Sequence, residues 1–422
     1  MSPEVTAAII AAGVGVLTVP ATVAVQISGR RATSRDTQKA FKEQREQLNT
    51  TLAAQREQLD RTLAEQRTRT LNERFATAAE QLGSDKPAVR LTGVYAMAGL
   101  ADDWPENRQT CVDVLCAYLR MPYEPDPGDE APESERLAFR AIREVRHTVI
   151  RVIAAHLKDE AVTSWQGLNF DFTGVVFDGG DFSGAVFSGG TVDFRRARFS
   201  GGEVDFSHAV FSSGRVNFES AWFSGGRVDF ILAEFSGSDV FFYHAVFSGA
   251  TVNFDARFSG SRVGFNSARF SGGSVSFGEA ELSGGEVIFA MAQFSGGHVD
   301  FLATVFSGAE VDFRFAQFSG GEVYFGHAVF SGGRVIFTDA KFSGSKVSFG
   351  YASFSGGTVD FTAAGISPIG SIRFSDAEFS GGTVDFTDPA DPDDWSFPPA
   401  FPWTGTPPPG VKLPKKEDQS QT

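Results

Sequence analysis

Histidine is the side chain best suited to acid–base or metal chemistry near neutral pH, and this chain of 422 residues has 6 of them. His208, His244 and His327 occupy the same slot of a repeating sequence, but they lie 36 and 83 residues apart. His147 and His156 lie nine residues apart on one predicted helix. Because the ligands of one metal ion must meet within a few ångströms, neither spacing suits a shared site, and we predict no metal site.

The other reactive residue types form no catalytic pattern. Asp and Glu recur in many units, as in TVDF and EVDF, and a carboxylate repeated in this way forms a surface rather than an acid–base pair. The sequence has no Walker, Rossmann, GxSxG or HExxH motif. Cys111 and Cys116 are five residues apart on a predicted helix and cannot pair locally, so we expect two buried thiols in a reducing compartment. We therefore predict no catalytic residue, no cofactor and no enzyme activity.

The composition points to a repeat and away from a nucleic-acid binder. Phe accounts for 43 residues and Gly for 46, far above Met (4), Trp (5) and Tyr (6), whereas an ordinary core mixes several apolar types. The 52 acidic residues outnumber the 37 basic ones, for a formal charge of −15, which argues against direct nucleic-acid binding. The length predicts two or more structural units.

The first predicted unit, residues 1–29, is a membrane anchor. Val5 to Gly29 carries no charge and is long enough to span a bilayer. Basic residues follow this run, beginning with Arg30 and Arg31, which favours a retained helix and places the bulk of the chain in the cytoplasm. A cleaved signal peptide and a buried or interfacial helix are the alternatives. We predict a single-pass membrane protein.

Two helical units are predicted next. Residues 30–72 contain no Gly or Pro and should form a helical stalk, in which EQREQLNTTLA is followed by AQREQLDRTLA. This 11-residue repeat aligns four leucines, Leu48, Leu52, Leu59 and Leu63. The pattern fits either a right-handed coiled coil, and hence a homo-oligomer, or a lone solvated helix. Residues 73–160 should form a small α-helical module.

Residues 168–388 are predicted to form a β-solenoid. From Phe187 the unit FSGG-xVxF-xxAx recurs every twelve residues, with one residue missing before Phe258 and one gained around Ser367–Phe374. Val and Phe of xVxF fall on the same side of a short strand, and Ser-Gly-Gly supplies a corner. Each unit is too short to bury its apolar side, so stacked units should form internal ladders of Phe, Val and Ala, with Leu282 replacing one Phe. One coil uses either twelve or twenty-four residues; the sequence fits both.

The Ala-x-Phe-Ser-Gly pentamers, as at Ala185–Gly189 and Ala328–Gly332, resemble the pentapeptide-repeat family. The run Phe172–Phe187 has that family's five-residue period, and the later twelve-residue unit departs from it. Glu73–Arg120 is similar to a helical module found before such repeats in bacterial membrane-associated proteins. The resemblance implies a mainly β fold, in which a transmembrane helix, a stalk and a helical module precede a right-handed parallel β-helix. It also implies a location in the bacterial inner membrane.

The same resemblance leaves two functions to weigh. The family's most familiar activity is DNA mimicry by proteins that bind DNA gyrase. Between Leu168 and Asp388 there are 24 acidic and 13 basic residues, an excess that fits either a DNA-like face or a solvated surface. We predict an interaction scaffold with an unknown protein partner. The alternative is a DNA-mimic inhibitor or protector of DNA gyrase or another nucleic-acid enzyme.

The tail, residues 389–422, is rich in proline. Solenoid ends expose apolar ladders, and four aromatic residues of the tail are candidates to cover the last coil. They are Trp395, Phe397, Phe401 and Trp403. The stretch from Pro407 on is predicted to be disordered.

Overall fold

The computed structural model describes residues 33–124, 126–367, 371–388 and 399–414. The chain divides into two compact units, Met1–Arg69 and Thr70–Thr422. Helix α2 (Thr33–Leu82) begins in the first unit and ends in the second. Between residues 39 and 70 every residue of this helix is exposed, whereas in its last turns Leu71, Ala78 and Leu82 are buried.

The predicted transmembrane helix is not an element of the described structure. No helix formed by the residues just given is long and apolar enough to cross a membrane. The longest, α2, is rich in Glu, Gln, Arg and Thr. The proposed anchor, Val5–Gly29, lies outside the described residues. The prediction of a transmembrane helix in the fold, and with it of a single-pass protein of the bacterial inner membrane, is therefore wrong for the described chain.

The helical module of the second unit packs three further helices and a short 3-10 turn against the end of α2. These elements are α3 (Pro87–Asp103), η1 (Pro105–Asn107), α4 (Arg108–Arg120) and α5 (Glu133–Leu157). Both cysteines lie on α4 and are fully buried, as predicted. Burial raises the pKa of the Cys111 thiol to about 11 and that of Cys116 to about 12, so both thiols are protonated and unreactive near neutral pH.

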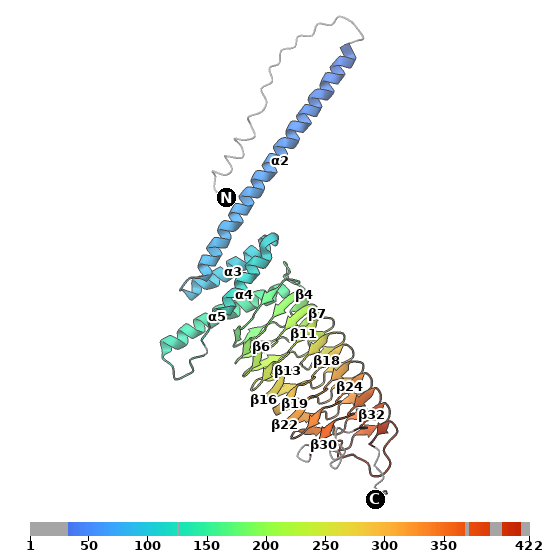
Figure 1. The fold of residues 1–422 in the computed structure, drawn as a ribbon. Coiled ribbons are helices and arrows are strands. Elements are labelled where there is room, and N and C mark those ends of the chain that lie inside the picture. The colour runs from blue at the N-terminus through green and yellow to red at the C-terminus, as the bar shows by residue number, and fades with distance from the viewer. Residues whose placement is uncertain (1–32, 125, 368–370, 389–398, 415–422) are drawn as a thin grey trace. The chain divides into compact units, whose positions relative to one another are not determined.

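A parallel β-solenoid of the right-handed type follows, with about ten coils (Figure 1). Its strands are short and fall into two sheets, here called sheet A and sheet B. Sheet A contains β1 (Phe170–Asp171), β4 (Val186–Asp193), β7 (Val210–Asn217), β10 (Glu234–Phe235), β11 (Asp239–Phe241), β14 (Arg257–Phe258), β15 (Arg262–Gly264), β17 (Glu281–Leu282), β18 (Glu286–Ile288), β20 (Val305–Phe306), β21 (Glu310–Asp312), β23 (Val329–Phe330), β24 (Arg334–Ile336), β27 (Ser353–Phe354), β28 (Thr358–Asp360), β31 (Glu378–Phe379), β32 (Thr383–Asp385) and β33 (Val411–Lys412). Sheet B contains β2 (Val176–Phe177), β3 (Gly180–Asp181), β5 (Arg198–Phe199), β6 (Glu203–Asp205), β8 (Trp222–Phe223), β9 (Arg227–Asp229), β12 (Val246–Phe247), β13 (Thr251–Asn253), β16 (Arg269–Ser276), β19 (Gln293–Asp300), β22 (Gln317–Tyr324), β25 (Lys341–Phe342), β26 (Lys346–Ser348), β29 (Gly365–Ile366) and β30 (Ser371–Arg373).

The pairing register shows that one coil uses twenty-four residues. Phe187 lies beside Phe211, and no described strand pairs with the unit twelve residues away. From β4 on, a regular coil therefore contains two twelve-residue units, one in each sheet, and four short strands, such as β10 to β13. The offset falls to twenty-three between Phe235 and Phe258 and rises to twenty-five between Phe354 and Phe379. Both slips occur where the sequence predicts a missing and a gained residue.

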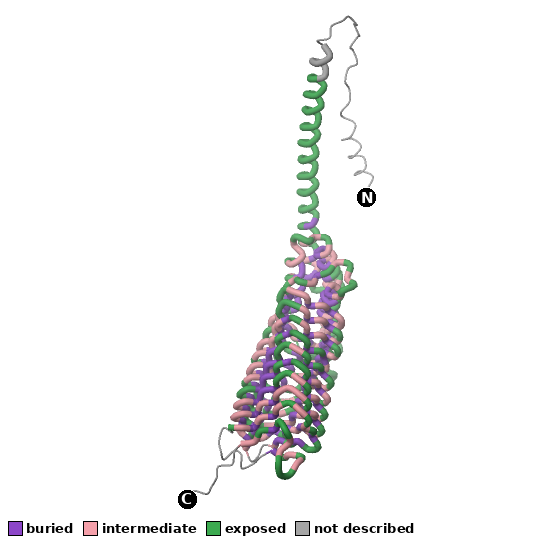
Figure 2. Tube along the Cα trace, turned by 90° about the vertical axis from the view of Figure 1, so that its right-hand side faces the viewer, coloured by how far each residue is buried: buried purple, intermediate pink, exposed green. Residues whose placement is uncertain are grey.

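The interior is built from four ladders of phenylalanine, two in each sheet. Within a ladder the rings stack almost parallel; Phe218 and Phe242, for example, have centroids 4.6 Å apart and planes at 3°. Rings of opposite sheets meet edge to face, as Phe218 and Phe230 do at 6.2 Å and 83°. Leu282 is fully buried in the ladder between Phe258 and Phe306. The tube view shows these inward residues as a buried interior running through the coils (Figure 2).

The glycines of the Ser-Gly-Gly corner are required because successive coils approach closely there. At Gly202 the backbone is left-handed (φ +63°), and a Cβ would clash with the carbonyl oxygen of Asp178 in the preceding coil. Where Ser or Ala replaces the second glycine, as at Ser238, Ser261 and Ser345, the backbone is not left-handed and the small side chain is buried. The second position of the corner therefore holds either a glycine with a left-handed backbone or a small buried residue without one. Either choice lets the neighbouring coil approach closely.

The tail covers the last coil. Phe401 stacks on Phe374 with centroids 5.5 Å apart, and Trp403 meets Phe379 edge-on at 5.0 Å, which confirms the predicted cap for these two residues. Trp395 and Phe397 lie outside the described residues. The prediction of disorder from Pro407 on is wrong for residues 407–414, since strand β33 pairs in parallel with β32, and the rest of that stretch lies outside the described residues. Gly410, with a φ of +90°, turns the chain so that this strand can add to the sheet.

Replacing one ladder ring should destabilise the solenoid locally. Phe270 is buried between Phe247 and Phe294, each 4.8 Å away, so Phe270→Ala should lower the free energy of unfolding by about 3–5 kcal/mol. Arg269→Ala, at the exposed neighbouring position, should cost less than about 0.5 kcal/mol. Urea unfolding and amide exchange measure both. Equal effects of the two substitutions would reverse the assigned inward and outward faces.

Two adjacent glycines give a matched test of the corner. Gly202→Ala should destabilise the solenoid by more than about 1 kcal/mol, because the left-handed φ and the carbonyl of Asp178 both oppose a Cβ. Gly201→Ala should change stability by less than about 0.5 kcal/mol, since nothing lies within 4 Å of the added atom. Thermal melting of the two variants compares them directly. A larger loss for Gly201→Ala would contradict the close approach at Gly202.

Candidate interaction surface

The histidines are dispersed and serve the fold. His208, His244 and His327 each occupy a turn position with a left-handed backbone, at φ 57°, 56° and 54°. His208 and His327 stand where sheet B passes into sheet A, and His244 stands where sheet A passes into sheet B. No group of His, Cys, Asp or Glu among the residues with described positions could hold a metal ion.

The repeated carboxylate of xVDF has a local task that the sequence did not reveal. The Asp205 carboxylate accepts a hydrogen bond from the backbone N–H of Ser207 at 2.7 Å. The same contact recurs at other coils, for example from Thr362 to Asp360 at 3.0 Å. Asn217 and Ser276 replace the aspartate in two units and accept the equivalent bond. These residues close an Asx-type turn that leads into the left-handed position, so they are structural groups rather than acid–base pairs.

A polar cluster joins the helical module to the first coil. The Asp178 carboxylate accepts hydrogen bonds from the Tyr123 hydroxyl at 2.7 Å and the Arg143 Nε at 3.0 Å, and its other oxygen lies 3.0 Å from His147 Nε2. Burial alone would raise the pKa of Asp178, but hydrogen bonds with His147 and Tyr123 and the charge of Arg143 hold it below its ordinary value. This part-buried cluster contains a carboxylate, an imidazole, a phenol and a guanidinium, which are also the side-chain types of many catalytic sites.

The neighbouring contacts show that this cluster attaches the helical module to the first coil of the solenoid, and it is here called the Asp178 fastening. Arg146 is buried, and its guanidinium donates to the carbonyl oxygens of Leu119 at 2.7 Å and Val176 at 2.8 Å. Its Cζ atom lies over the Tyr123 ring, 4.1 Å from the ring centroid. Trp165 makes a second attachment. Its Nε1 donates a hydrogen bond to the Asp102 carboxylate at 2.9 Å, and its ring stacks on the imidazole of His156 with the centroids 3.9 Å apart. The helices are thereby tied over the open end of the solenoid.

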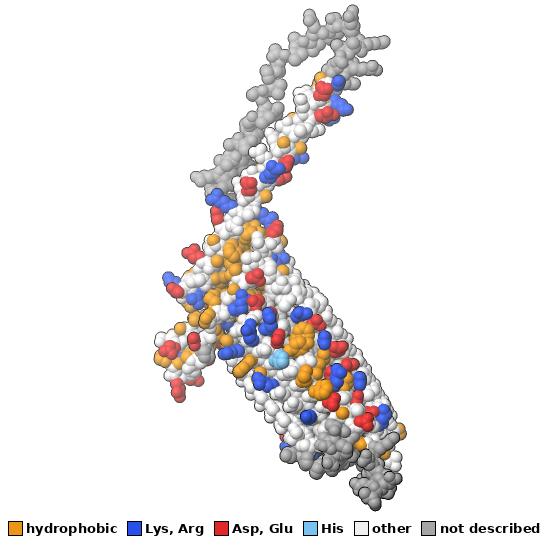
Figure 3. Space-filling model, viewed as in Figure 1, with side chains coloured by type: hydrophobic (Ala, Val, Ile, Leu, Met, Phe, Trp, Pro, Cys, Tyr) orange, Lys and Arg blue, Asp and Glu red, His pale blue; other side chains and the backbone are white. Residues whose placement is uncertain are grey.

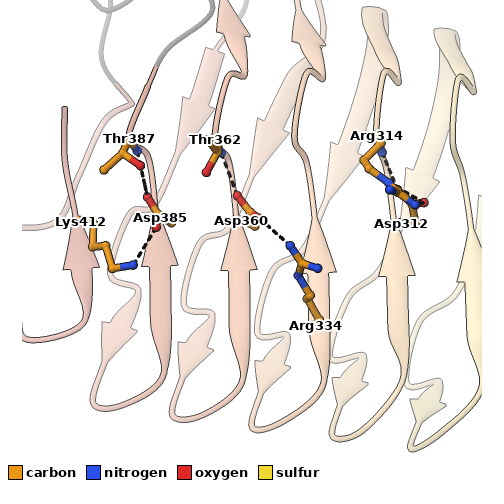
Figure 4. A network of polar contacts seen from close by, with 8 residues as sticks. All are labelled: Asp312, Arg314, Arg334, Asp360, Thr362, Asp385, Thr387 and Lys412. Atoms are coloured by element: carbon orange, nitrogen blue, oxygen red, sulfur yellow. Dashed lines mark hydrogen bonds and ion pairs between the residues drawn. The ribbon is translucent and has the colours of Figure 1, made fainter.

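Some acidic side chains on the solenoid are paired with basic neighbours. Figure 4 shows three examples in successive coils of sheet A. Asp312 pairs with Arg314 at 2.6 Å, Asp360 with Arg334 at 2.9 Å, and Asp385 with Lys412 at 2.9 Å. One outward row of sheet A reads Thr191, Arg215, Asp239, Arg262, Glu286, Glu310, Arg334 and Thr358. No described outward row of this sheet is a continuous line of negative charge.

One edge of the solenoid differs from the rest. The residues that precede the first phenylalanine of each sheet B unit form an outward column, here called the basic edge: Arg198, Trp222, Val246, Arg269, Gln293, Gln317 and Lys341. This column contains three cations and no carboxylate. Arg198, Arg269 and Lys341 are exposed and make no ion pair within the described part of the chain. An otherwise acidic rod thus carries one line of unneutralised positive charge.

Large apolar side chains lie along the same edge. Trp222 is 51% exposed, and Met291 and Phe315, at the adjoining turns of successive coils, are each 54% exposed. On the sheet A side of these turns the rings of Phe241 and Tyr243 stack at 4.7 Å. A space-filling view of the solenoid shows hydrophobic side chains gathered beside Lys and Arg on one face (Figure 3). Aromatic residues next to arginine are the usual composition of a protein-binding hot spot.

The opposite edge, where sheet B passes into sheet A, has the opposite charge. Leu232 and Tyr351 are exposed there, but the neighbours include Glu234, Glu279 and Glu281. The unit that lacks one residue has no left-handed turn position, and a hollow of about 180 Å³ opens beside Asp255. Burial raises the pKa of this carboxyl.

Sequence reasoning missed the basic edge because its members are neighbours only when the coil length is known. With twelve residues per coil Arg198 would lie next to Val210; with twenty-four it lies next to Trp222. The composition of each column could have been read from the sequence once the twenty-four-residue period was given.

Comparison with known proteins finds a family model that matches part of this solenoid. Residues 172–222 match the family model described as pentapeptide repeats (9 copies). The match covers the first coils and leaves the helical module and the later twelve-residue units outside it. No curated protein is similar enough to give a match. The matched segment and the described coils agree on a pentapeptide-repeat β-solenoid.

The Asp178 fastening should make stability depend on acidic pH. A carboxyl whose pKa is lowered on folding stabilises the fold above its unfolded pKa, about 3.9, and that contribution is lost as the pH falls through the folded pKa. Asp178→Asn should therefore cost about 1.5–3 kcal/mol at pH 7 and progressively less below pH 4. Urea unfolding at pH 7, 5 and 3 measures this difference. Glu310→Gln, at an exposed position, serves as the control, and a pH-independent loss for Asp178→Asn would exclude a role for its charge.

Proposed function

We propose that this chain is a non-catalytic interaction scaffold and that the basic edge is its working surface. The observation that supports the proposal is the line of unneutralised cations flanked by exposed Trp222, Met291 and Phe315 on an otherwise acidic rod. Exposing these apolar side chains to water is unfavourable, and their burial by a partner would recover about 25 cal/mol per Å² of apolar surface. The partner should then be a protein segment that carries acidic and apolar side chains.

The dimensions of the edge suit an extended segment. Arg198 and Lys341 are six coils apart, and at about 4.8 Å per coil the column is about 29 Å long. An extended peptide of about nine residues covers this length at about 3.3 Å per residue. The ladders hold the column rigid, so binding would order few groups of the scaffold itself. Complementary charge would orient the segment, and the aromatic residues would supply most of the affinity.

The alternative function, mimicry of DNA towards gyrase or another nucleic-acid enzyme, has less support. Such a mimic requires continuous negative potential along one face. The outward row through Arg215, Arg262 and Arg334 contains both signs of charge, and the carboxylates of Asp312 and Asp360 are paired with arginine. These observations favour a partner that is itself acidic.

Photo-crosslinking from the two edges tests this function. A photoreactive amino acid at position 222 or 315 should capture the same acidic protein, whereas one at 232 or 351 on the opposite edge should not. Binding of that protein should weaken at least tenfold in Trp222→Ala with Phe315→Ala, because two hot-spot side chains contribute more than about 1 kcal/mol each. Leu232→Ala with Tyr351→Ala is the matched control. Equal capture from both edges, or capture of nothing acidic, would overturn the proposal.

A further inference from the structure

The first unit presents an unpartnered apolar stripe. On α2 five large side chains are between 44% and 69% exposed: Phe41, Leu48, Leu52, Leu59 and Leu63. At 3.6 residues per turn they fall within an arc of about 60°. The remaining residues of this stretch are Glu, Gln, Arg, Lys, Asp, Asn and Thr, together with Ala53 and Ala54. The five large apolar side chains therefore form one continuous stripe along an otherwise polar helix and are not scattered around it.

A helix with this composition needs a partner to be stable. Isolated helices are marginal in water, and most helical stability in proteins comes from packing one apolar face. Within Met1–Arg69, α2 is the only element that the described residues form, so the described residues of this unit offer the stripe nothing to pack against. The four leucines recur at an interval of eleven residues, which keeps the stripe straight along a right-handed supercoil.

The polar members of the stripe identify the partner. Gln44 and Gln55 come three residues after Phe41 and Leu52. At about 3.67 residues per turn, the value for an 11-residue repeat, both lie about 33° to one side of Leu48 and Leu59, so a layer of glutamine follows the apolar layers. When two copies pair in parallel and in register, each glutamine faces its own copy, and an amide can both donate to and accept from an identical amide. An antiparallel pair would place glutamine against leucine and leave a buried amide unsatisfied.

The charges beside the stripe are compatible with the same arrangement. Arg45 and Arg56 border one side, and Thr51, Gln58 and Thr62 border the other. In a parallel symmetric pair, one side of a helix faces the other side of its copy. Each arginine would then lie opposite neutral polar residues, and no like charges would meet.

We propose that α2 pairs in parallel and in register with α2 of a second copy of this chain through the stripe from Phe41 to Leu63. The pairing is independent of the function proposed above. It would bring two basic edges onto one assembly, so that a partner with two binding segments would bind more tightly than one with a single segment.

The mass of the full chain tests the pairing. Light scattering should give the mass of two chains for the parent and of one chain for Leu52→Asp with Leu63→Asp, since two buried aspartates in each helix oppose association. Thr50→Asp with Ala54→Asp adds the same charge to the opposite side of α2 and should leave the mass unchanged. A single-chain parent, or equal dissociation by both variants, would overturn the proposal. Unfolding of the second unit should be the same in all three proteins.

A cysteine probe distinguishes the parallel, in-register pair from other arrangements. Gln55→Cys should form a covalent pair of chains on mild oxidation, because identical positions of the stripe come within the 4.4–6.8 Å that a disulfide requires between Cα atoms. Ala54→Cys, on the far side of the helix, should not. Cys111 and Cys116 are buried and protonated, so they add no background. Absence of the Gln55 product, or equal products from both probes, would overturn the parallel register.

Discussion

The stacking of phenylalanine rings at the spacing of parallel strands is the constraint on which the rest of the solenoid depends. Strands in a sheet lie about 4.8 Å apart, and the rings of Phe218 and Phe242 stack at 4.6 Å, so a ladder satisfies the backbone and the side chains with one repeat. The close approach that this spacing imposes leaves no room for a Cβ at corners such as Gly202. The Asp of xVDF follows from the same constraint, because the chain must turn at each ladder and its backbone N–H groups need acceptors.

Since the interior is fixed, the chemistry of the surface is arranged in columns. Each outward position lies beside the equivalent position one coil away, and the residue type there is free to vary without disturbing the ladder. In some columns acids and bases pair across coils, as Glu286 does with Arg262 at 3.3 Å. The basic edge contains cations without such partners, and exposed Trp222, Met291 and Phe315 lie beside it. This coincidence of two unfavourable features in one place is the basis of the proposed binding surface.

The sequence predicts the ladder better than it predicts the surface. Inward Val and Phe, the buried Leu282 and the two register slips follow from periodicity, because a ladder excludes polar residues at fixed intervals. Coil length does not follow, since a coil of twelve and a coil of twenty-four bury the same residues. Without it, Arg198 and Trp222 could not be recognised as neighbours. The Asp178 fastening joins residues that are thirty or more apart, and strand β33 comes from a Pro-rich tail, so neither leaves a periodic signal. The uncharged run near the N-terminus gave the transmembrane prediction that the described helices do not support.

The two ends of the rod decide how it can bind a partner. A parallel solenoid has an open sheet edge at each end, and an exposed edge can add a strand from another chain. The first coil is covered by the helical module, where Arg146 donates to the Val176 carbonyl and Arg143 donates to the Asp178 carbonyl at 2.9 Å. The last coil is covered by Phe401, Trp403 and β33. Strand addition at the ends is thus blocked by the described residues, and the proposed partner would use side chains along the rod. A lateral surface offers no backbone hydrogen bonds, so specificity must come from the identity of the side chains in a column, and this is the feature that sets the basic edge apart.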